Sequence, residues 1–170
     1  MCGLALCDKR AGLFSNRSLK MSDVFSSVGT VVSVDDTAPA TYDTTGFAAL
    51  TWASCGELSD LPAFGSEAAL ATHTPLATGI VAKRRGSVNY GSVTLTMAVS
   101  ATDAGQAIFE TKADAAAGSD ATVSVKVELV DGSIQYFTAQ VMSYRVNVAN
   151  ADSITMAEVV LEIDNSIVKA

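Results

Sequence analysis

Three runs between residues 93 and 163 alternate apolar side chains with small or polar ones, and they constrain the fold more than any other feature. Their apolar positions are Val93, Leu95, Met97 and Val99, then Val123, Val125, Val127 and Leu129, then Ala157, Val159, Leu161 and Ile163. Because successive side chains on a strand point to opposite faces, each run predicts a strand with one face toward a core. The β-branched residues in these runs also favour a pleated, half-buried surface.

The dipeptide Asp131-Gly132 separates two of these predicted strands. Glycine tolerates the positive φ that primed hairpin turns demand, so this dipeptide is a strong hairpin signal. We therefore predict that residues 123–130 and 135–144 pair as antiparallel strands.

Residues 102–117 predict a short helix between the first two runs. Ser100 or Thr102 is suited to cap its start, Asp103 lies near the positive end of the helix dipole, and Gly118 is a natural stop. The helix is short and weakly amphipathic, so it needs a sheet to stabilise it. Together these patterns predict a mainly β (α+β) fold, an antiparallel β-sandwich or barrel with one short flanking α-helix.

The first half of the chain is less regular. Residues 28–34 and 47–53 predict two further strands, the second bearing the only tryptophan, Trp52. Residues at about 56–82 lack a strong period and contain Pro62 and Pro75, which predicts a long loop. Loops of this length in compact domains are usually functional.

This predicted loop carries more apolar bulk than a solvated loop needs. Its large apolar residues are Leu61, Phe64, Leu70, Leu76 and Ile80. They either pack against their own domain or contact a neighbouring subunit, and we favour the second reading because exposed apolar patches usually mark contact sites. The basic residues Lys83, Arg84 and Arg85 follow at once. They suit contact with phosphate or, as we favour in so acidic a chain, pairing with acidic groups on an adjacent subunit.

Length and charge limit the classes of function. A chain of 170 residues is long enough for one domain with a sizeable core. Its formal net charge of −7 argues against a general nucleic-acid-binding role, which requires a basic face. No apolar run approaches the roughly 20 residues of a membrane-spanning helix, so we expect no membrane partner.

The first 20 residues differ from the rest in charge. Lys9, Arg10, Arg17 and Lys20 against Asp8 give a net charge of +3, which leaves −10 on the remaining 150 residues. The apolar run 3–7 is too short for a signal peptide, and charges follow it rather than precede it. We therefore interpret residues 1–21 as an N-terminal arm or an upstream extension, and residues 22–170 as a single β domain.

Cysteine and histidine are too few and too scattered for a metal site. Cys2 and Cys7 are distant from Cys55, and His73 is the only histidine, so these residues do not make a zinc ligand set. With three cysteines, one is unpaired within a monomer, and free thiols in a cytosolic site of synthesis are the simplest interpretation.

No catalytic motif is present either. His73 lacks a partner nucleophile elbow of the G-x-S-x-G type. Glu57, Asp60 and Glu67 do not follow the alternating spacing of a calcium loop, and we interpret them as solvated charge. Asp35-Asp36 matches turn chemistry, and Gly86, Gly91 and Gly105 do not form a phosphate-binding loop. We expect a protein that is not an enzyme and uses no cofactor.

The order of these segments resembles the major tail tube protein of long, flexible-tailed bacteriophages, the family of the lambda tail tube protein. The resemblance covers about residues 22–170 and rests on the strand entered at Gly86-Ser87, the helix opening Ala104-Gly105-Gln106-Ala107, the Asp131-Gly132 turn, and the segments 123–129, 136–143 and 155–163. The segment 56–65 falls where that family places a long inter-subunit loop. The first 20 residues do not match the family.

This resemblance implies a structural protein of the virion tail that is assembled in the host cytoplasm. Six copies would form a ring whose sheets join around a channel, and stacked rings would enclose the tape-measure protein and later conduct DNA. Partners would be further copies of the chain, the tape-measure protein and tail-tip or terminator proteins, with DNA passing unbound. Leu61, Phe64, Leu70, Leu76, Ile80, Lys83, Arg84 and Arg85 would make inter-subunit or inter-ring contacts.

Strand parity adds a hypothesis about the channel. Glu128, Glu158 and Glu162 occupy second-face positions of their strands, where their charge would repel phosphates and let DNA slide.

Two alternative functions stay open from the sequence. The inner tube of a contractile tail or of a secretion-type machine would share this architecture. A β-sandwich binding or adhesion module would instead be a monomer with exposed aromatic residues, yet aromatics are only 6% of the chain.

Overall fold

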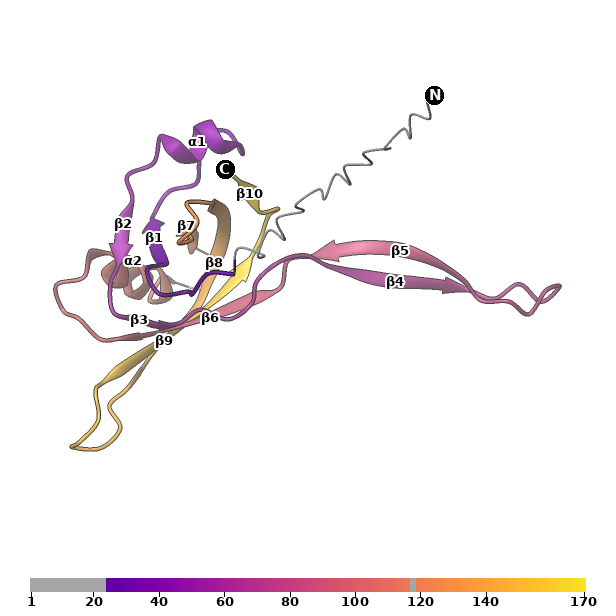
Figure 1. The fold of residues 1–170 in the computed structure, drawn as a ribbon. Helices are drawn as coiled ribbons and strands as arrows, with labels where there is room; N and C mark the ends of the chain where they lie inside the picture. The colour runs from indigo at the N-terminus through magenta and orange to yellow at the C-terminus, as the bar shows by residue number, and fades with distance from the viewer. Residues whose placement is uncertain (1–23, 117–118) are drawn as a thin grey trace, which may run out of the picture.

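The computed structural model describes residues 24–116 and 119–170. Within them lie β1 (Val31–Asp35), α1 (Thr44–Ala48), β2 (Ala53–Cys55), β3 (Leu58–Asp60), β4 (Glu67–His73), β5 (Ala82–Asn89), β6 (Ser92–Ala98), α2 (Ala104–Ala113), β7 (Thr122–Glu128), β8 (Ile134–Asn147), β9 (Met156–Ile163) and β10 (Val168–Lys169). Eight strands form one sheet in the order β2-β1-β7-β8-β9-β6-β3, with β10 beside β8. All pairings are antiparallel. The strands β4 and β5 form a separate two-stranded sheet that projects from the body (Figure 1).

The alternating runs do supply the core. The buried apolar side chains of β6, β7 and β9 are Val93, Leu95 and Met97, then Val123, Val125 and Val127, then Ala157, Val159, Leu161 and Ile163. Phe137 of β8 and Phe109 of α2 complete this core on the same face of the sheet. Two positions at the ends of runs depart from the prediction, since Val99 lies beyond β6 and is 40% exposed, and Leu129 is only half-buried.

The predicted β7–β8 hairpin is confirmed. The two strands pair from Thr122 opposite Gln140 to Glu128 opposite Ile134. Gly132 in the turn has a φ of 85°, the left-handed conformation that glycine adopts without strain. The Asp131 side chain accepts hydrogen bonds from the Ser133 amide at 3.0 Å and from the Ser133 hydroxyl at 2.7 Å, which fixes the turn.

The predicted helix is present as α2, with two corrections to its ends. Asp103 itself is the N-cap, because its side chain accepts a hydrogen bond from the Gln106 amide at 2.9 Å. The predicted caps Ser100 and Thr102 lie outside the helix. The helix ends at Ala113, earlier than predicted, and the predicted stop Gly118 lies outside the described residues.

The strand predicted at residues 47–53 is wrong. Residues 44–48 form the helix α1, because the Asp43 side chain accepts from the Gly46 amide at 2.8 Å and so caps a helical turn. Phe47 is fully buried and its ring stacks on Tyr136 of β8 at 5.1 Å between centroids. Only Ala53–Cys55 pairs as a strand in this region, and the strand predicted at 28–34 begins at Val31. The described residues therefore contain two short helices, whereas the sequence predicted one.

The loop predicted at residues 56–82 is also wrong. This segment contains β3 and β4, and β4 pairs with β5 in a long hairpin. Thr74-Pro75 and Gly79 mark its turn, where Gly79 has a φ of 62° and its amide donates to the Pro75 carbonyl at 2.9 Å. The signal for the two strands was weak because their residues have no alternating apolar pattern.

Further sequence predictions concern the domain boundaries of the chain and its relation to a membrane. The N-terminal arm or extension predicted at residues 1–21 lies outside the described residues, and the single domain at 22–170 stays a prediction. Neither helix in the described part of the chain is long and apolar enough to cross a membrane.

Candidate assembly surfaces

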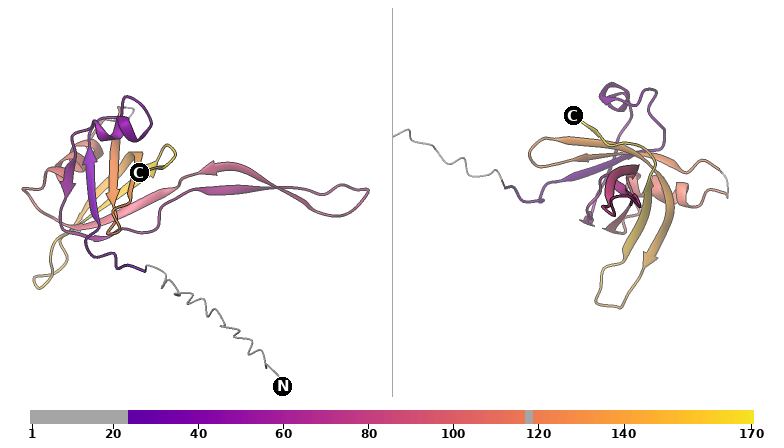
Figure 2. Two further views of the ribbon diagram at one scale, coloured as in Figure 1. Left: turned by 45° about the horizontal axis from the view of Figure 1, so that its top comes forward. Right: turned by 90° about the vertical axis from the view of Figure 1, so that its right-hand side faces the viewer.

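The hairpin of β4 and β5, residues 67–89, is called the arm. Strands of seven and eight residues extend it by roughly 25 Å at about 3.3 Å per residue. Its residues are exposed almost throughout, and only Ala68, Pro75 and Gly86 are half-buried. Figure 2 shows the arm standing away from the body in a second view. Since an isolated two-stranded hairpin is at best marginally stable in water, packing against another surface would stabilise an arm of this length.

The far end of the arm, residues 74–82, is called the tip, and it contains no charged side chain. Leu76 is 105% exposed and Ile80 is 73% exposed. Solvated turns are normally polar, so this composition is typical of a surface that becomes buried.

The three predicted basic residues lie on β5 directly behind the tip. Lys83 pairs with Thr72 and Arg85 with Leu70, so these two side chains share one face of the arm. Arg84 pairs with Ala71 and belongs to the other face. Leu70 is 64% exposed beside Arg85. The arm thus combines exposed apolar residues with a local positive charge in an otherwise acidic chain.

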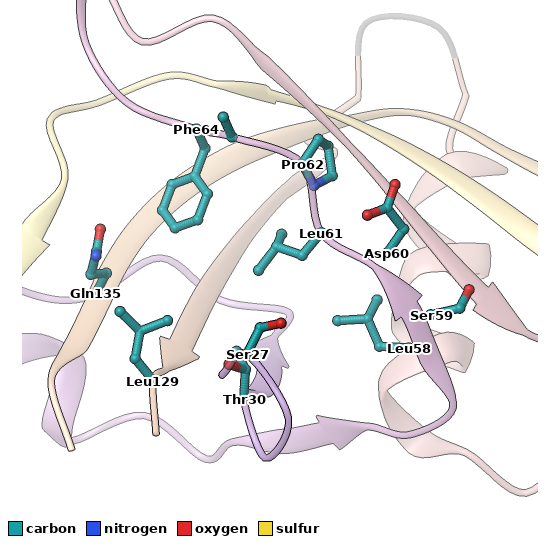
Figure 3. A pocket seen from close by; sticks show the side chains of 11 residues that line it. Ser27, Thr30, Leu58, Ser59, Asp60, Leu61, Pro62, Phe64, Leu129 and Gln135 are labelled. Carbon is teal, nitrogen blue, oxygen red and sulfur yellow. The ribbon is translucent and has the colours of Figure 1, made fainter. Parts of the chain in front are cut away.

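A groove lies at the base of the arm, where the chain leaves β3, and we call it the root groove (Figure 3). Its volume is about 450 Å³. The lining residues are Ser27, Thr30, Leu58, Ser59, Asp60, Leu61, Pro62, Ala63, Phe64, Leu129 and Gln135. Leu61, Phe64 and Leu129 point toward a common space, while serine, threonine and glutamine side chains form much of the rim.

The predicted apolar contact residues therefore divide into two groups. Leu61 and Phe64 are half-buried against the chain's own core, and the Phe64 ring lies 5.5 Å from that of Phe137. Leu70, Leu76 and Ile80 are exposed on the arm. Sequence reasoning missed the root groove because its walls come from segments far apart in the chain. The run of uncharged residues at 74–82 was a visible signal for the tip.

A third surface is the second face of β6, β9 and the distal half of β8, which we call the open face. Register places Thr94 and Thr96 of β6 opposite Val160 and Glu158 of β9. Among the described residues, neither helix packs over this half of the sheet, since α2 lies on the core face and α1 lies over Tyr136. Glu158 and Glu162 are exposed there, and Arg145 is the direct cross-strand neighbour of Glu158.

Glu128 lies on the same sheet face but in a different setting. Its carboxylate is 3.5 Å from the Lys126 ammonium group, and this ammonium group lies 5.8 Å from the centre of the Trp52 ring. This end of the sheet is covered by α1 and the residues that follow it. Glu128 is therefore separated from the two glutamates of the open face.

The residues set aside as catalytic or metal ligands lie apart. His73 is exposed at the end of β4, Glu57 connects β2 to β3, and Glu67 begins β4. Among residues 24–116 and 119–170, no three His, Cys, Asp or Glu side chains are grouped to hold a metal ion. Cys55 is a free, buried thiol, and burial, together with the nearby Asp103, raises its pKa to about 12.

Comparison with known proteins places this fold among tail tubes. No family model and no curated protein matches the sequence. A chain in the structure of the sheath/tube terminator of an extracellular contractile injection system, PVC, is similar over 88% of this chain and 99% of its own, with a TM-score of 0.66 and 11% identity. A chain of the tail of an empty GTA particle, with C6 symmetry, matches at a TM-score of 0.59 and 12% identity, covering 85% and 97%. The SPP1 tail tube matches at 0.53 and 15% identity, covering 82% and 75%. The fold is tail-tube-like.

Proposed function

We propose that this chain is a structural tail protein that self-assembles into rings of six, which stack into a tube that conducts DNA. The arm carries the proposal, because the exposed apolar residues of a projecting hairpin are typical of a surface that becomes buried against another molecule. The sixfold count is supported by the C6 symmetry of the GTA tail whose chain shares this fold. The proposed partners are other copies of the chain, a tape-measure protein and tail-tip or terminator proteins.

In this proposal the arm and the root groove make the inter-subunit or inter-ring contacts. Leu70, Leu76 and Ile80 would become buried on assembly, and Lys83, Arg84 and Arg85 would meet acidic groups of a neighbouring copy. Leu61 and Phe64 would take part from the root groove while remaining packed on their own core.

The open face is the proposed channel surface. Glu158 and Glu162 are exposed there among threonines, which suits a hydrated wall that repels phosphate. Arg145 offsets part of that charge through its position beside Glu158. Glu128 is a weaker member of this set, since Lys126 neutralises it locally.

The second candidate is the inner tube of a contractile tail or injection machine. The observation that favours it is the similarity to a chain of the PVC sheath/tube terminator, with a TM-score of 0.66. An inner tube of that kind requires a sheath-binding outer surface, which a flexible-tail tube does not need. Mixing the assembled protein with a candidate sheath subunit distinguishes the two functions. Binding of the sheath subunit to the tube would support the inner-tube function, and no binding would support the flexible-tail tube.

Negative-stain electron microscopy of the purified full chain tests the proposal. Rings or tubes at high protein concentration are expected. A monodisperse monomer under the same conditions, measured by light scattering, contradicts assembly and favours a β-sandwich binding or adhesion module.

A further inference from the structure

We propose that the tip of the arm on one copy of this chain inserts into the root groove of a second copy. The inference rests on the proposed self-assembly and names both sides of one contact: the knob is Leu76 with Ile80, and the receptor is the groove at the base of the next arm.

The tip is a preorganised apolar knob. Its turn is fixed by the Gly79 amide, which donates to the Pro75 carbonyl at 2.9 Å, and by the Thr78 amide, which donates to the same oxygen at 3.3 Å. Leu76 and Ile80 are thus held exposed by an ordered backbone. A knob that is already ordered loses little conformational entropy when it binds, so its buried apolar area contributes more to affinity.

The root groove has the chemistry of a receptor for such a knob. Leu61, Phe64 and Leu129 form apolar walls that already pack on the core, so the groove is rigid (Figure 3). Its volume of about 450 Å³ is in the range of sites that enclose small apolar groups. Thr30 and Gln135 on the rim supply polar groups for the backbone of an inserted turn.

The charges behind the two surfaces are complementary. Lys83 and Arg85 follow the tip on one face of the arm. Asp60 lines the root groove, and Asp131 lies in the turn that connects the groove residues Leu129 and Gln135. When the knob enters the groove, the basic residues arrive at its rim, where opposite charges set orientation and association rate.

The occupant must be a second copy, because the groove lies at the base of the arm and the tip lies at its far end, roughly 25 Å away. A contact between the end of one arm and the base of the next is heterologous. Such contacts propagate from copy to copy and close into rings or continue as filaments.

Site-specific photo-crosslinking tests the contact. The full chain carries p-benzoylphenylalanine in place of Leu76 and is mixed with a heavy-isotope-labelled copy before irradiation. Crosslinked peptides are expected to join position 76 to residues 58–64 or 129–135 of the other isotope. The variant Ala63→Arg, whose exposed side chain lines the groove, should lower the yield at least tenfold, whereas Ala101→Arg at an exposed site outside it should not.

The outcomes separate this contact from assembly itself. Rings or tubes whose position-76 adducts fall outside the groove overturn the inference and leave the proposed function standing. A probe at Ala63 that captures residues 1–23 instead of the tip also overturns it, since the chain's own N-terminal segment would then occupy the groove. Monomers without any inter-copy adduct overturn both proposals.

Discussion

Gly105 of α2 lies directly against Cys55 of β2, so closely that a Cβ atom on Gly105 would come within 2.5 Å of the Cys55 sulfur. The Ser54 carbonyl oxygen and the Cys55 amide nitrogen would lie at 2.9 and 3.1 Å from that atom. Two residues earlier, the N-cap Asp103 accepts a hydrogen bond from the Gly56 amide at 2.6 Å. The helix start is therefore fixed to the edge strand through backbone contact as well as through the core.

We expect Gly105→Ala to destabilise the protein by up to about 2 kcal/mol. In an open helix, replacing glycine with alanine stabilises by about 1 kcal/mol, but the overpacking against β2 costs about 1–3 kcal/mol and reverses the sign. Urea unfolding followed by Trp52 fluorescence measures the change. The control Ala107→Gly, at an exposed position of the same helix, should cost about 1 kcal/mol by propensity alone. A gain of stability in Gly105→Ala would refute the close approach.

The Cys55 thiol predicts how stability depends on alkaline pH. Burial is the main cause that raises its pKa from 9.0 to about 12, with Asp103 contributing. Between about pH 9 and 12 the unfolded chain therefore loses this proton while the folded chain keeps it. The free energy of unfolding should fall by up to about 1.4 kcal/mol per pH unit in that window, and be unaffected by this thiol below pH 9.

Urea unfolding at pH 8 and pH 10 measures this effect. Cys2 and Cys7 are replaced by serine in both the reference protein and its control, so that Cys55 is the only cysteine of the reference protein. The control Cys55→Ala should lose less stability between these two pH values. Equal losses in the two proteins would show that the thiol is not protected in the folded state.

The strands in the C-terminal half of the chain were predictable, because period-two alternation and a turn dipeptide both follow directly from backbone geometry. Val123, Val125 and Val127 identify their face without any tertiary information. The N-terminal half was not predictable in the same way. Phe47 lies on a one-turn helix that is stabilised by the Asp43 cap and by stacking on Tyr136, a residue distant in the chain.

The candidate surfaces show the same division. Leu76 and Ile80 stood out because apolar bulk in an irregular segment is visible in the sequence, and both are exposed, while their contact role stays a prediction. The root groove was not, since Thr30, Leu61 and Leu129 meet only after the sheet has formed. The arm was missed as a hairpin because its strands bury neither face within the chain, which removes the alternation that marks a strand.

The basic residues behind the tip predict assembly that depends on salt. Replacing Lys83, Arg84 and Arg85 with glutamate should raise the concentration needed for assembly about tenfold at low salt, since rim charges contribute roughly 0.5 kcal/mol each. The difference should shrink in 1 M salt, where the screening length is about 3 Å. Sedimentation of assemblies measures it. Adding Asp60→Lys and Asp131→Lys should restore part of the loss, and no rescue would argue against these two acids as the partners.

The proposed channel surface leads to a prediction about the two glutamates of the open face. We expect Glu158→Lys with Glu162→Lys to leave tubes intact, because both side chains are exposed and neither contributes to the core. The altered tubes should retain double-stranded DNA in a salt-dependent manner, since lysines on a channel wall release counterions from phosphates. Particles that carry them should eject DNA poorly.

Fluorescent DNA co-sedimenting with tubes measures retention against the control Glu57→Lys with Asp120→Lys. This control makes the same change of net charge at exposed sites away from the open face. Equal retention in the two double variants would indicate a general charge effect. Normal ejection by the open-face variant would place the channel wall on another surface, because four units of added positive charge per subunit on that wall must slow a polyanion.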